Sequence, residues 1–256
     1  MGKWHKGTRA GNDGDPGNTL EDLLGVSENN LKLPDFGEIE LKTQAYESGG
    51  LITLFHKEPT PINGKAVTPS VIRSLGWKHK EAGSRYPATE LRFTSTTYGS
   101  YFTVRGLSLR CDDEQICILF DPTKVKLAGK DKTFEYSGYA TYKDWLDGIG
   151  ARNQDHYSKI FPIAFRLSEV QQWFKDKLNH TLLVLRQTNV EDGQVYYRYK
   201  EAYLMRDIKP AAIVELINLG GLCIEFDTRS GHNHGLKFRI KRKSLPRLFN
   251  EFALMI

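Results

Sequence analysis

The chain has 256 residues, of which 39% are hydrophobic and 26% are charged, enough for one large domain or two lobes with a hydrophobic core. It contains no run of about eighteen apolar residues and no signal peptide, so we expect a cytoplasmic protein without membrane segments. The formal net charge of +5 at pH 7 is too small to indicate nucleic-acid binding by itself.

The first predicted element is a short helix over residues 17–25. Thr19 is its expected N-terminal cap, Asp22 stands in the capping-box position, and Gly25 is expected to end the helix. Glu21 lies beside the apolar stripe, so its carboxylate is expected to lean over the same cleft as the acids that follow. The expected buried stripe consists of the leucines at Leu20, Leu23 and Leu24.

The most informative segment follows, where residues 34–43 read Pro-Asp-Phe-Gly-Glu-Ile-Glu-Leu-Lys-Thr. Asp35 stands in a predicted turn, and residues 39–43 alternate apolar and polar side chains as a half-buried strand does. Glu40 and Lys42 therefore share one face of the strand, with their Cα atoms about 7 Å apart, so that the ends of both side chains can converge on one small group.

This combination of two acids and a lysine suits the hydrolysis of phosphodiesters. Carboxylate oxygens hold Mg²⁺ well, and Mg²⁺ neutralises charge on the transferring phosphorus. Asp35 and Glu40 are the expected ligands, Glu21 is a third acid, and the backbone carbonyl of Leu41 is a further candidate oxygen. Lys42 would orient or deprotonate the attacking water. The alternative is an ordinary edge strand with Glu and Lys on its wet face, because the pattern D-x(4)-E-x-K is short.

The rest of the chain predicts a mixed series of strands and helices. Residues 58–100 are rich in proline, glycine, serine and threonine, which is typical of long loops that could wrap a duplex. A hairpin turn is expected at residues 191–193, which read Glu-Asp-Gly. The other expected elements are strands over 51–57, 101–109, 115–120, 181–187, 194–204 and 222–226, and helices that begin at Ser168 and Pro210.

A group of hydrogen-bond donors lies near the C-terminus. Arg229, His232, His234 and Arg239 can donate to base edges, and Lys237 belongs to a strand pattern whose basic face suits phosphates. The two histidines are a weak zinc site because no third ligand is near in sequence. The spacing also does not fit a His-Asn-His nuclease motif. An ordinary solvated surface loop is the remaining alternative.

Several segments, in the same order across nearly the whole chain, resemble one family. They are Trp4-His5 with the glycine-rich stretch after it, and residues 19–24, 34–43, 51–60 and 232–240. These segments resemble the MvaI/BcnI family of type II restriction endonucleases, relatives of the mismatch-repair nickase MutH within the PD-(D/E)xK nucleases. The resemblance puts Asp35, Glu40 and Lys42 on catalytic positions, Glu21 on an assisting acid, and Lys57 among the DNA-binding residues.

The resemblance implies a PD-(D/E)xK (MutH-like) α/β fold with a central mixed sheet flanked by helices and two lobes around a DNA cleft. Residues 1–100 would form the catalytic lobe and residues 101–256 the DNA-recognition lobe with parts of the shared sheet. The implied activity is Mg²⁺-dependent cleavage of double-stranded DNA by a monomer, at a short CC-N-GG-type site, leaving 5′-phosphate and 3′-hydroxyl ends.

The same resemblance implies that a cognate methyltransferase is a genetic partner only, and no membrane is expected as a partner. Two other functions stay open. A MutH-like nickase would share every catalytic residue but cut a single strand. A non-catalytic DNA-binding module would need no metal, so mutation of Asp35 and Glu40 would leave its function intact.

Overall fold

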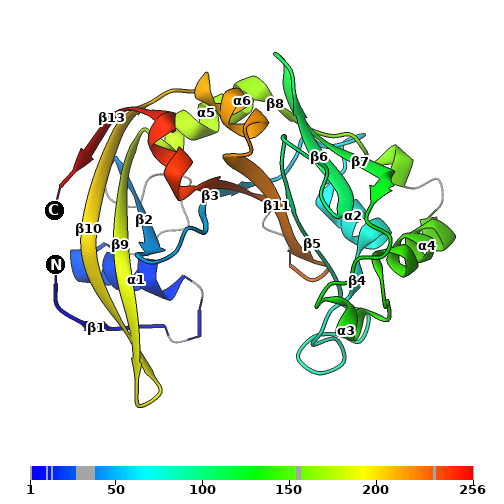
Figure 1. Ribbon diagram of the computed structural model, residues 1–256, viewed down its shortest axis with the longest axis horizontal. Coiled ribbons are helices and arrows are strands. Elements are labelled where there is room, and N and C mark those ends of the chain that lie inside the picture. The colour runs from blue at the N-terminus through cyan, green and yellow to red at the C-terminus, as the bar shows by residue number, and fades with distance from the viewer. Residues whose placement is uncertain are drawn as a thin grey trace. The chain divides into compact units, whose positions relative to one another are not determined.

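The computed structural model describes residues 2–9, 11–12, 14–26, 38–153, 157–232 and 235–255 (Figure 1). The chain divides into two compact units that interleave along the sequence. Unit 1 is Met1–Ile52, Val170–Ile213 and Lys241–Ile256, and unit 2 is Thr53–Glu169 and Val214–Ile240. The predicted lobes of residues 1–100 and 101–256 follow a different division, because each unit draws its strands from distant parts of the sequence.

Unit 1 is built on a five-stranded mixed sheet in the order β1-β10-β9-β2, with β13 also paired to β10. Strand β2 runs parallel to β9, and the other described pairs are antiparallel. The predicted mixed α/β character is therefore confirmed. The strands are β1 (His5–Lys6), β2 (Ile39–Ala45), β9 (His180–Glu191), β10 (Gln194–Ile208) and β13 (Phe249–Leu254).

The hairpin between β9 and β10 is where the sequence predicts it. Asp192 and Gly193 have φ angles of 49° and 73°, the left-handed conformation that both central residues of a tight type I′ turn require. Asp-Gly is a preferred pair for this turn because both residues tolerate positive φ. The long hairpin that follows from this turn brings Tyr197 and Tyr199 under the first helix, where both tyrosines are buried.

Helix α1 (Asp15–Leu24) begins earlier than predicted. Its first turn contains Pro16, whose fixed φ and missing N–H suit a helix start. The prediction of Thr19 as the cap is wrong. Thr19 is buried inside the helix and donates a hydrogen bond of 3.3 Å to Asp15 Oδ1. The buried Asp15 carboxylate also accepts hydrogen bonds from the Arg9 N–H at 2.6 Å and the Tyr197 hydroxyl at 2.9 Å, which fixes the start of α1.

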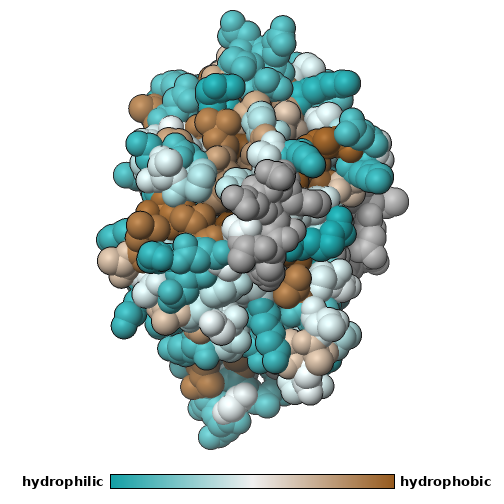
Figure 2. Space-filling model, turned by 90° about the vertical axis from the view of Figure 1, so that its right-hand side faces the viewer, coloured by the Kyte–Doolittle hydropathy of each residue, from teal (hydrophilic) through white to brown (hydrophobic). Residues whose placement is uncertain are grey.

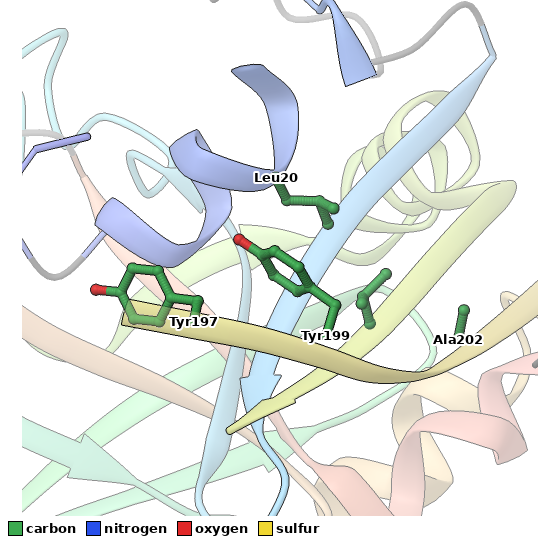
Figure 3. Close-up of a cluster of buried hydrophobic side chains, with 5 residues drawn as sticks. Leu20, Tyr197, Tyr199 and Ala202 are labelled. Carbon is green, nitrogen blue, oxygen red and sulfur yellow. The ribbon is translucent and has the colours of Figure 1, made fainter. Parts of the chain in front are cut away.

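Helix α1 packs on the sheet through its first turns. Leu20 projects from α1 toward Tyr199 in a small apolar cluster (Figure 3). Leu23 and Leu24 are 49% and 48% exposed, so the predicted stripe of three buried leucines is wrong. Periodicity identifies the buried face of a helix, but it does not show how far along the helix the covering sheet extends. The C-terminal end at Gly25 is confirmed by its left-handed φ of 69°.

Two helical segments are adjacent in sequence to strands of this sheet. Helix α5 (Leu167–Leu178) directly precedes β9, and the 3₁₀ segment η2 (Arg242–Leu248) directly precedes β13. The predicted helix is present as α5, and its residues Val170, Phe174 and Leu178 are all fully buried. Their spacing of four residues places them on one side of the helix.

Unit 2 holds a second five-stranded sheet in the order β3-β12-β11-β5-β4 and a three-stranded sheet in the order β6-β7-β8. Its strands are β3 (Leu51–Lys57), β4 (Trp77–Lys78), β5 (Leu91–Thr97), β6 (Arg105–Cys111), β7 (Gln115–Val125), β8 (Ile163–Arg166), β11 (Leu222–Arg229) and β12 (Leu236–Lys241). The remaining helices are α2 (Thr68–Leu75), α3 (Phe134–Ser137), α4 (Tyr142–Asn153), η1 (Tyr157–Lys159) and α6 (Ala212–Asn218).

The prediction of long loops over residues 58–100 is wrong, because α2, β4 and β5 lie there. A proline in the first turn starts α2 rather than breaking it, and the helix buries Val71, Ile72 and Leu75. In β5 the threonines act as β-branched strand residues. Thr97 is fully buried, and its hydroxyl donates a hydrogen bond of 2.5 Å to the Ile224 carbonyl.

The remaining features of the fold are the surface and the cysteine thiols. Within the described ranges, no helix is both long and apolar enough to span a membrane. On the face shown in Figure 2, hydrophilic residues cover most of the surface and apolar patches lie between them. Cys117 and Cys223 are buried thiols and Cys111 is partly buried. Burial raises the pKa of the Cys111 thiol to about 12 and also raises the pKa of the Cys117 thiol, so these two thiols are poor nucleophiles.

Candidate active site and nucleic-acid interface

Strand β2 places Glu40 and Lys42 on one face, as the alternation of the sequence predicts. The Lys42 ammonium contacts Glu40 Oε1 directly. The Glu40 side chain is only 2% exposed, although a lone edge strand would leave it in water. A glutamate is almost never fully buried unless it is paired. This burial therefore argues against the alternative of an ordinary solvated strand face.

A second lysine, which the sequence did not reveal, pairs with the same carboxylate. Lys177 Nζ lies 3.1 Å from Glu40 Oε2, so each carboxylate oxygen contacts one ammonium group. Lys177 is on the last turn of α5, and the following strand β9 pairs with β2 so that His180 is opposite Ile39. No local pattern could indicate this contact, because it depends on the parallel pairing of β2 with a strand far along the chain.

The structure describes only one of the other two predicted acids. Asp35 lies outside the described residues. Glu21 is half-buried on α1, which lies beside β2, since a Cβ on Gly17 would be 3.9 Å from Thr43 Oγ1. Glu21 follows Gly17 by one helical turn and so lies on the same side of α1. The described residues bring the helix that carries Glu21 next to the strand that carries Glu40.

The donor chemistry around Glu40 fits a hard divalent cation. Carboxylate and carbonyl oxygens are the ligands that Mg²⁺ prefers, and the Glu40 carboxylate is such a donor, although each of its oxygens is paired with a lysine ammonium with which a bound ion would share it. Among the described residues, no group of three histidine, cysteine, aspartate or glutamate side chains is placed to hold a metal. A metal site here therefore depends on Asp35, and the ligand roles of Asp35 and of the Leu41 carbonyl stay predictions.

A second charged cluster covers one face of the β5-β11-β12 part of the unit 2 sheet, here called the polar sheet face. Strand register puts Glu225 opposite Lys237 and Asp227 opposite Thr94. The opposite face packs into the core, where Ile224, Phe226 and Phe238 are fully buried. This alternation is what a strand with one wet face requires. The polar sheet face consists of Arg92, Thr94, Thr96, Glu225, Asp227, Arg229, Lys237 and Arg239.

Three of the predicted DNA-binding residues come together on the polar sheet face, namely Arg229, Lys237 and Arg239. Two others lie near it, His232 by following β11 in the chain and Lys57 by packing in space. His232 is exposed in the turn after β11, and the Lys57 backbone packs closely against Gly235 at the start of β12. His234 lies outside the described residues. The role of these cations in reading bases or binding phosphates stays a prediction.

Ion pairs connect the strands of the polar sheet face. Arg239 Nη1 lies 2.6 Å from Glu225 Oε2, and Arg92 Nη2 lies 3.2 Å from Asp227 Oδ1. Lys237 contacts Glu225 and Asp227. Burial would raise the pKa of Asp227, but the hydrogen bond and charge of Lys237, together with Arg92, hold that pKa below its ordinary value. The cations of this face are therefore held in fixed positions by acids.

Three members of this face were not predicted from the sequence, namely Arg92, Glu225 and Asp227. A signal for the two acids was present, because residues 222–229 read Leu-Cys-Ile-Glu-Phe-Asp-Thr-Arg and alternate in hydropathy. Arg92 gave no such signal, since its pairing with β11 joins segments about half the chain apart.

Comparisons with known proteins agree on a single family. The model of the MvaI/BcnI restriction endonuclease family matches residues 1–249. Curated proteins gave no match. Among solved structures, the chain is similar to a complex of restriction endonuclease MvaI with cognate DNA substrate, with a TM-score of 0.72 and 22% identity over 99% of this chain and 92% of that chain.

Restriction endonuclease MvaI in the absence of DNA matches with a TM-score of 0.48 and 21% identity, over 99% of this chain and 93% of that chain. At these identities the structural likeness to the DNA complex shows the fold, and the family model shows the relationship. The chain therefore belongs to the MvaI/BcnI restriction endonuclease family and is a type II site-specific deoxyribonuclease.

Proposed function

We propose that this endonuclease hydrolyses double-stranded DNA with Mg²⁺ at the Glu40 cluster of unit 1, leaving 5′-phosphate and 3′-hydroxyl ends. Asp35, Glu40 and the Leu41 carbonyl would hold the ion, with Lys42 and Glu21 beside it. The observation that carries the proposal is the burial of the Glu40 carboxylate between two lysine ammonium groups. A strand that served only as structure would gain nothing from a buried charge that needs two partners.

Each side chain of the cluster has a distinct role in this proposal. When bound, Mg²⁺ would supply Lewis acidity at the scissile phosphate. Lys42 orients the attacking water and stabilises charge that develops on the phosphate oxygens, since its ammonium is a fixed neighbour of Glu40. Lys177 holds the second oxygen of Glu40 and so fixes the carboxylate plane. Glu21 supplies a further acid from α1.

We propose that the polar sheet face reads the DNA sequence. Arg229 and Arg239 would donate to guanine O6 and N7 in the major groove, and Glu225 and Asp227 would accept from cytosine amino groups. This mixture of arginines and acids suits a site made of G·C pairs, such as the CC-N-GG type that the sequence resemblance implies. Lys237, Lys57, His232 and His234 complete the proposed DNA-binding set, chiefly through phosphates.

The oligomeric state and the genetic setting follow the sequence resemblance. We propose that the enzyme acts as a monomer, so that one active site cuts the two strands in turn. A cognate methyltransferase would protect the host site and would not bind this chain.

The test is digestion of one plasmid of known sequence with and without Mg²⁺, followed by sequencing of the ends. We expect linear product only with Mg²⁺, and ends that carry a 5′-phosphate at one short sequence. Nicked circles as the end product would favour the MutH-like nickase. Intact plasmid with Mg²⁺, combined with tight DNA binding, would favour the non-catalytic binding module.

Replacing Asp35 by asparagine in the same assay is expected to abolish cutting and to spare binding. The variant loses one negative oxygen from the proposed metal site, while the polar sheet face is unchanged. Binding is measured by titrating a duplex that carries the mapped site in EDTA. A variant that cuts at the wild-type rate would remove Asp35 from the site.

A further inference from the structure

The guanidinium of Arg229 lies in a socket formed by residues of another segment. Its Nη1 is 3.1 Å from Glu90 Oε1, and its Cζ is 4.3 Å from the centre of the Tyr86 ring. Glu90 is 4% exposed and Arg229 is 27% exposed. A guanidinium stacked on an aromatic ring and paired with a carboxylate has few accessible rotamers. We call Glu90 and Tyr86 the Arg229 socket.

The segment that carries the socket is itself well fixed. The His79 N–H donates to the Glu90 carbonyl at 2.9 Å, and the Tyr86 N–H donates to the Glu81 carbonyl at 3.1 Å. The His79 ring packs edge-on against the Tyr86 ring at 4.9 Å. These contacts hold His79, Tyr86 and Glu90 to one another within the loop between β4 and β5, although residues 83–85 and 87–89 of that loop are exposed.

The Glu90 carboxylate also holds the turn that follows β11. The Gly231 N–H donates to Glu90 Oε1 at 2.8 Å. A Cβ on Gly231 would lie 2.9 Å from Arg229 Nη1 and 3.1 Å from Glu90 Oε2, so the close approach suits glycine. The Ser230 N–H donates to the Leu91 carbonyl at 2.9 Å. One buried carboxylate therefore fixes both Arg229 and the turn that leads to His232.

The charge state of Glu90 agrees with this role. Burial would raise its pKa, but the hydrogen bonds from the Gly231 N–H, Arg229 and Ser230 outweigh burial, and the pKa lies below its ordinary value. Glu90 is therefore ionised at neutral pH and keeps its pair with Arg229. A guanidinium carries five N–H donors, so a pair through Nη1 is compatible with a bidentate contact to a base through its other donors.

We propose that Glu90 and Tyr86 are positioning residues for sequence recognition: they pre-orient Arg229 toward one base pair and so determine specificity without contacting DNA. The inference rests on the proposed DNA-reading role of Arg229. The physical reason is preorganisation, because an arginine already held in one conformation loses less side-chain entropy on binding. The Glu90 carboxylate pairs with one edge of the Arg229 guanidinium and leaves another edge for the base. The same pair prevents Arg229 from turning toward a neighbouring phosphate.

The test compares Glu90→Gln with Arg229→Ala and with the double variant. Kd is measured in EDTA for a duplex that carries the mapped site and for duplexes in which each base pair of that site is changed in turn. We expect Glu90→Gln to weaken binding to the mapped site by about tenfold. We also expect Glu90→Gln and Arg229→Ala to relax discrimination at the same base pair. The double variant should bind no more weakly than Arg229→Ala, because Glu90 acts through Arg229.

Further variants separate positioning from a structural role. Tyr86→Phe keeps the ring and should behave as wild type, whereas Tyr86→Ala should relax discrimination at the same base pair as Arg229→Ala. This comparison decides the question if Glu90→Gln does not fold. The control is Glu169→Gln, which removes the exposed Arg166–Glu169 pair of 3.3 Å in the same unit and should change neither binding nor discrimination.

Four results would overturn the inference. If Glu90→Gln weakens binding to every duplex by the same factor, Glu90 has a structural role only. Relaxed discrimination at another base pair, or additive losses in the double variant, would separate Glu90 from Arg229. If Arg229→Ala discriminates as wild type does, the proposed reading role of Arg229 fails and the inference fails with it; in that case the Mg²⁺-dependent cutting by wild type shows that the active-site proposal stands.

Discussion

Replacing Glu40 by glutamine is expected to lower the rate of DNA cleavage by on the order of 10³-fold or more. A neutral amide supplies no negative oxygen to a divalent cation. The change also leaves the ammonium groups of Lys42 and Lys177, which contact the two Glu40 oxygens in the native protein, without a compensating charge. The measurement is the single-turnover rate on a duplex that carries the mapped site, at saturating enzyme and Mg²⁺.

The control for this prediction is Glu47→Gln, because Glu47 lies two residues after the end of β2 and is exposed. It should cleave as wild type does. Thermal unfolding of both variants checks that each is folded, and binding in EDTA should change little for Glu40→Gln, since the polar sheet face belongs to unit 2. Cleavage by Glu40→Gln at a rate within about threefold of wild type would exclude Glu40 as an essential ligand.

Replacing Lys42 by methionine is expected to reduce the single-turnover rate by about 10²- to 10⁴-fold, the usual range for a residue that assists proton transfer or stabilises charge in the transition state. Methionine keeps much of the side-chain length and removes the ammonium. Lys177→Met is the matched comparison, because both lysines pair with Glu40. It should reduce the rate by only about tenfold, since Lys177 acts by holding the carboxylate in place.

The two lysine variants decide which ammonium group serves the chemistry. Raising the Mg²⁺ concentration should partly restore Lys177→Met, whose defect is the positioning of a ligand, and should not restore Lys42→Met. A larger loss in Lys177→Met than in Lys42→Met would reverse the roles assigned to them. Equal small losses would mean that both lysines only neutralise the buried carboxylate.

The part of the active site that lies on one strand was predictable from the sequence. The alternation over residues 39–43 is a local property, and it correctly put Glu40 and Lys42 on one face. Lys177 was not predictable, because its contact with Glu40 requires β9 to pair in parallel with β2. The assignment of Asp35 stays a prediction from the sequence.

Local turn chemistry was likewise predictable, and longer-range packing was not. The Asp192-Gly193 hairpin depends on two residues that accept positive φ. The exposure of Leu23 and Leu24 depends on where the sheet ends under α1, which the helix sequence does not contain. The two interleaved units depend on pairings between distant strands. Local composition, on which the predicted boundary near residue 100 was based, contains no information about such pairings.

The polar sheet face likewise combines features that local sequence patterns predict with contacts that they do not predict. Lys237 and Arg239 were predicted on an alternating basic strand, whereas Arg229 was predicted in a loop and instead ends β11, on the same face as the other two. Glu90 was invisible as a partner of Arg229 because the two are separated by 139 residues in the chain. Glu90 and Arg92 join this region only through tertiary pairing, whereas Glu225 and Asp227 lie in a segment that alternates in hydropathy.

The central claim is that Glu40 and Asp35 bind a divalent cation beside Lys42. The most direct measurement is a crystal structure of the wild-type enzyme with a duplex that carries the mapped site and Mn²⁺, with an anomalous difference map. The account predicts an anomalous peak within coordination distance of carboxylate oxygens of both Glu40 and Asp35. A map in which the metal binds elsewhere, while Glu40 stays paired only with Lys42 and Lys177, would contradict it.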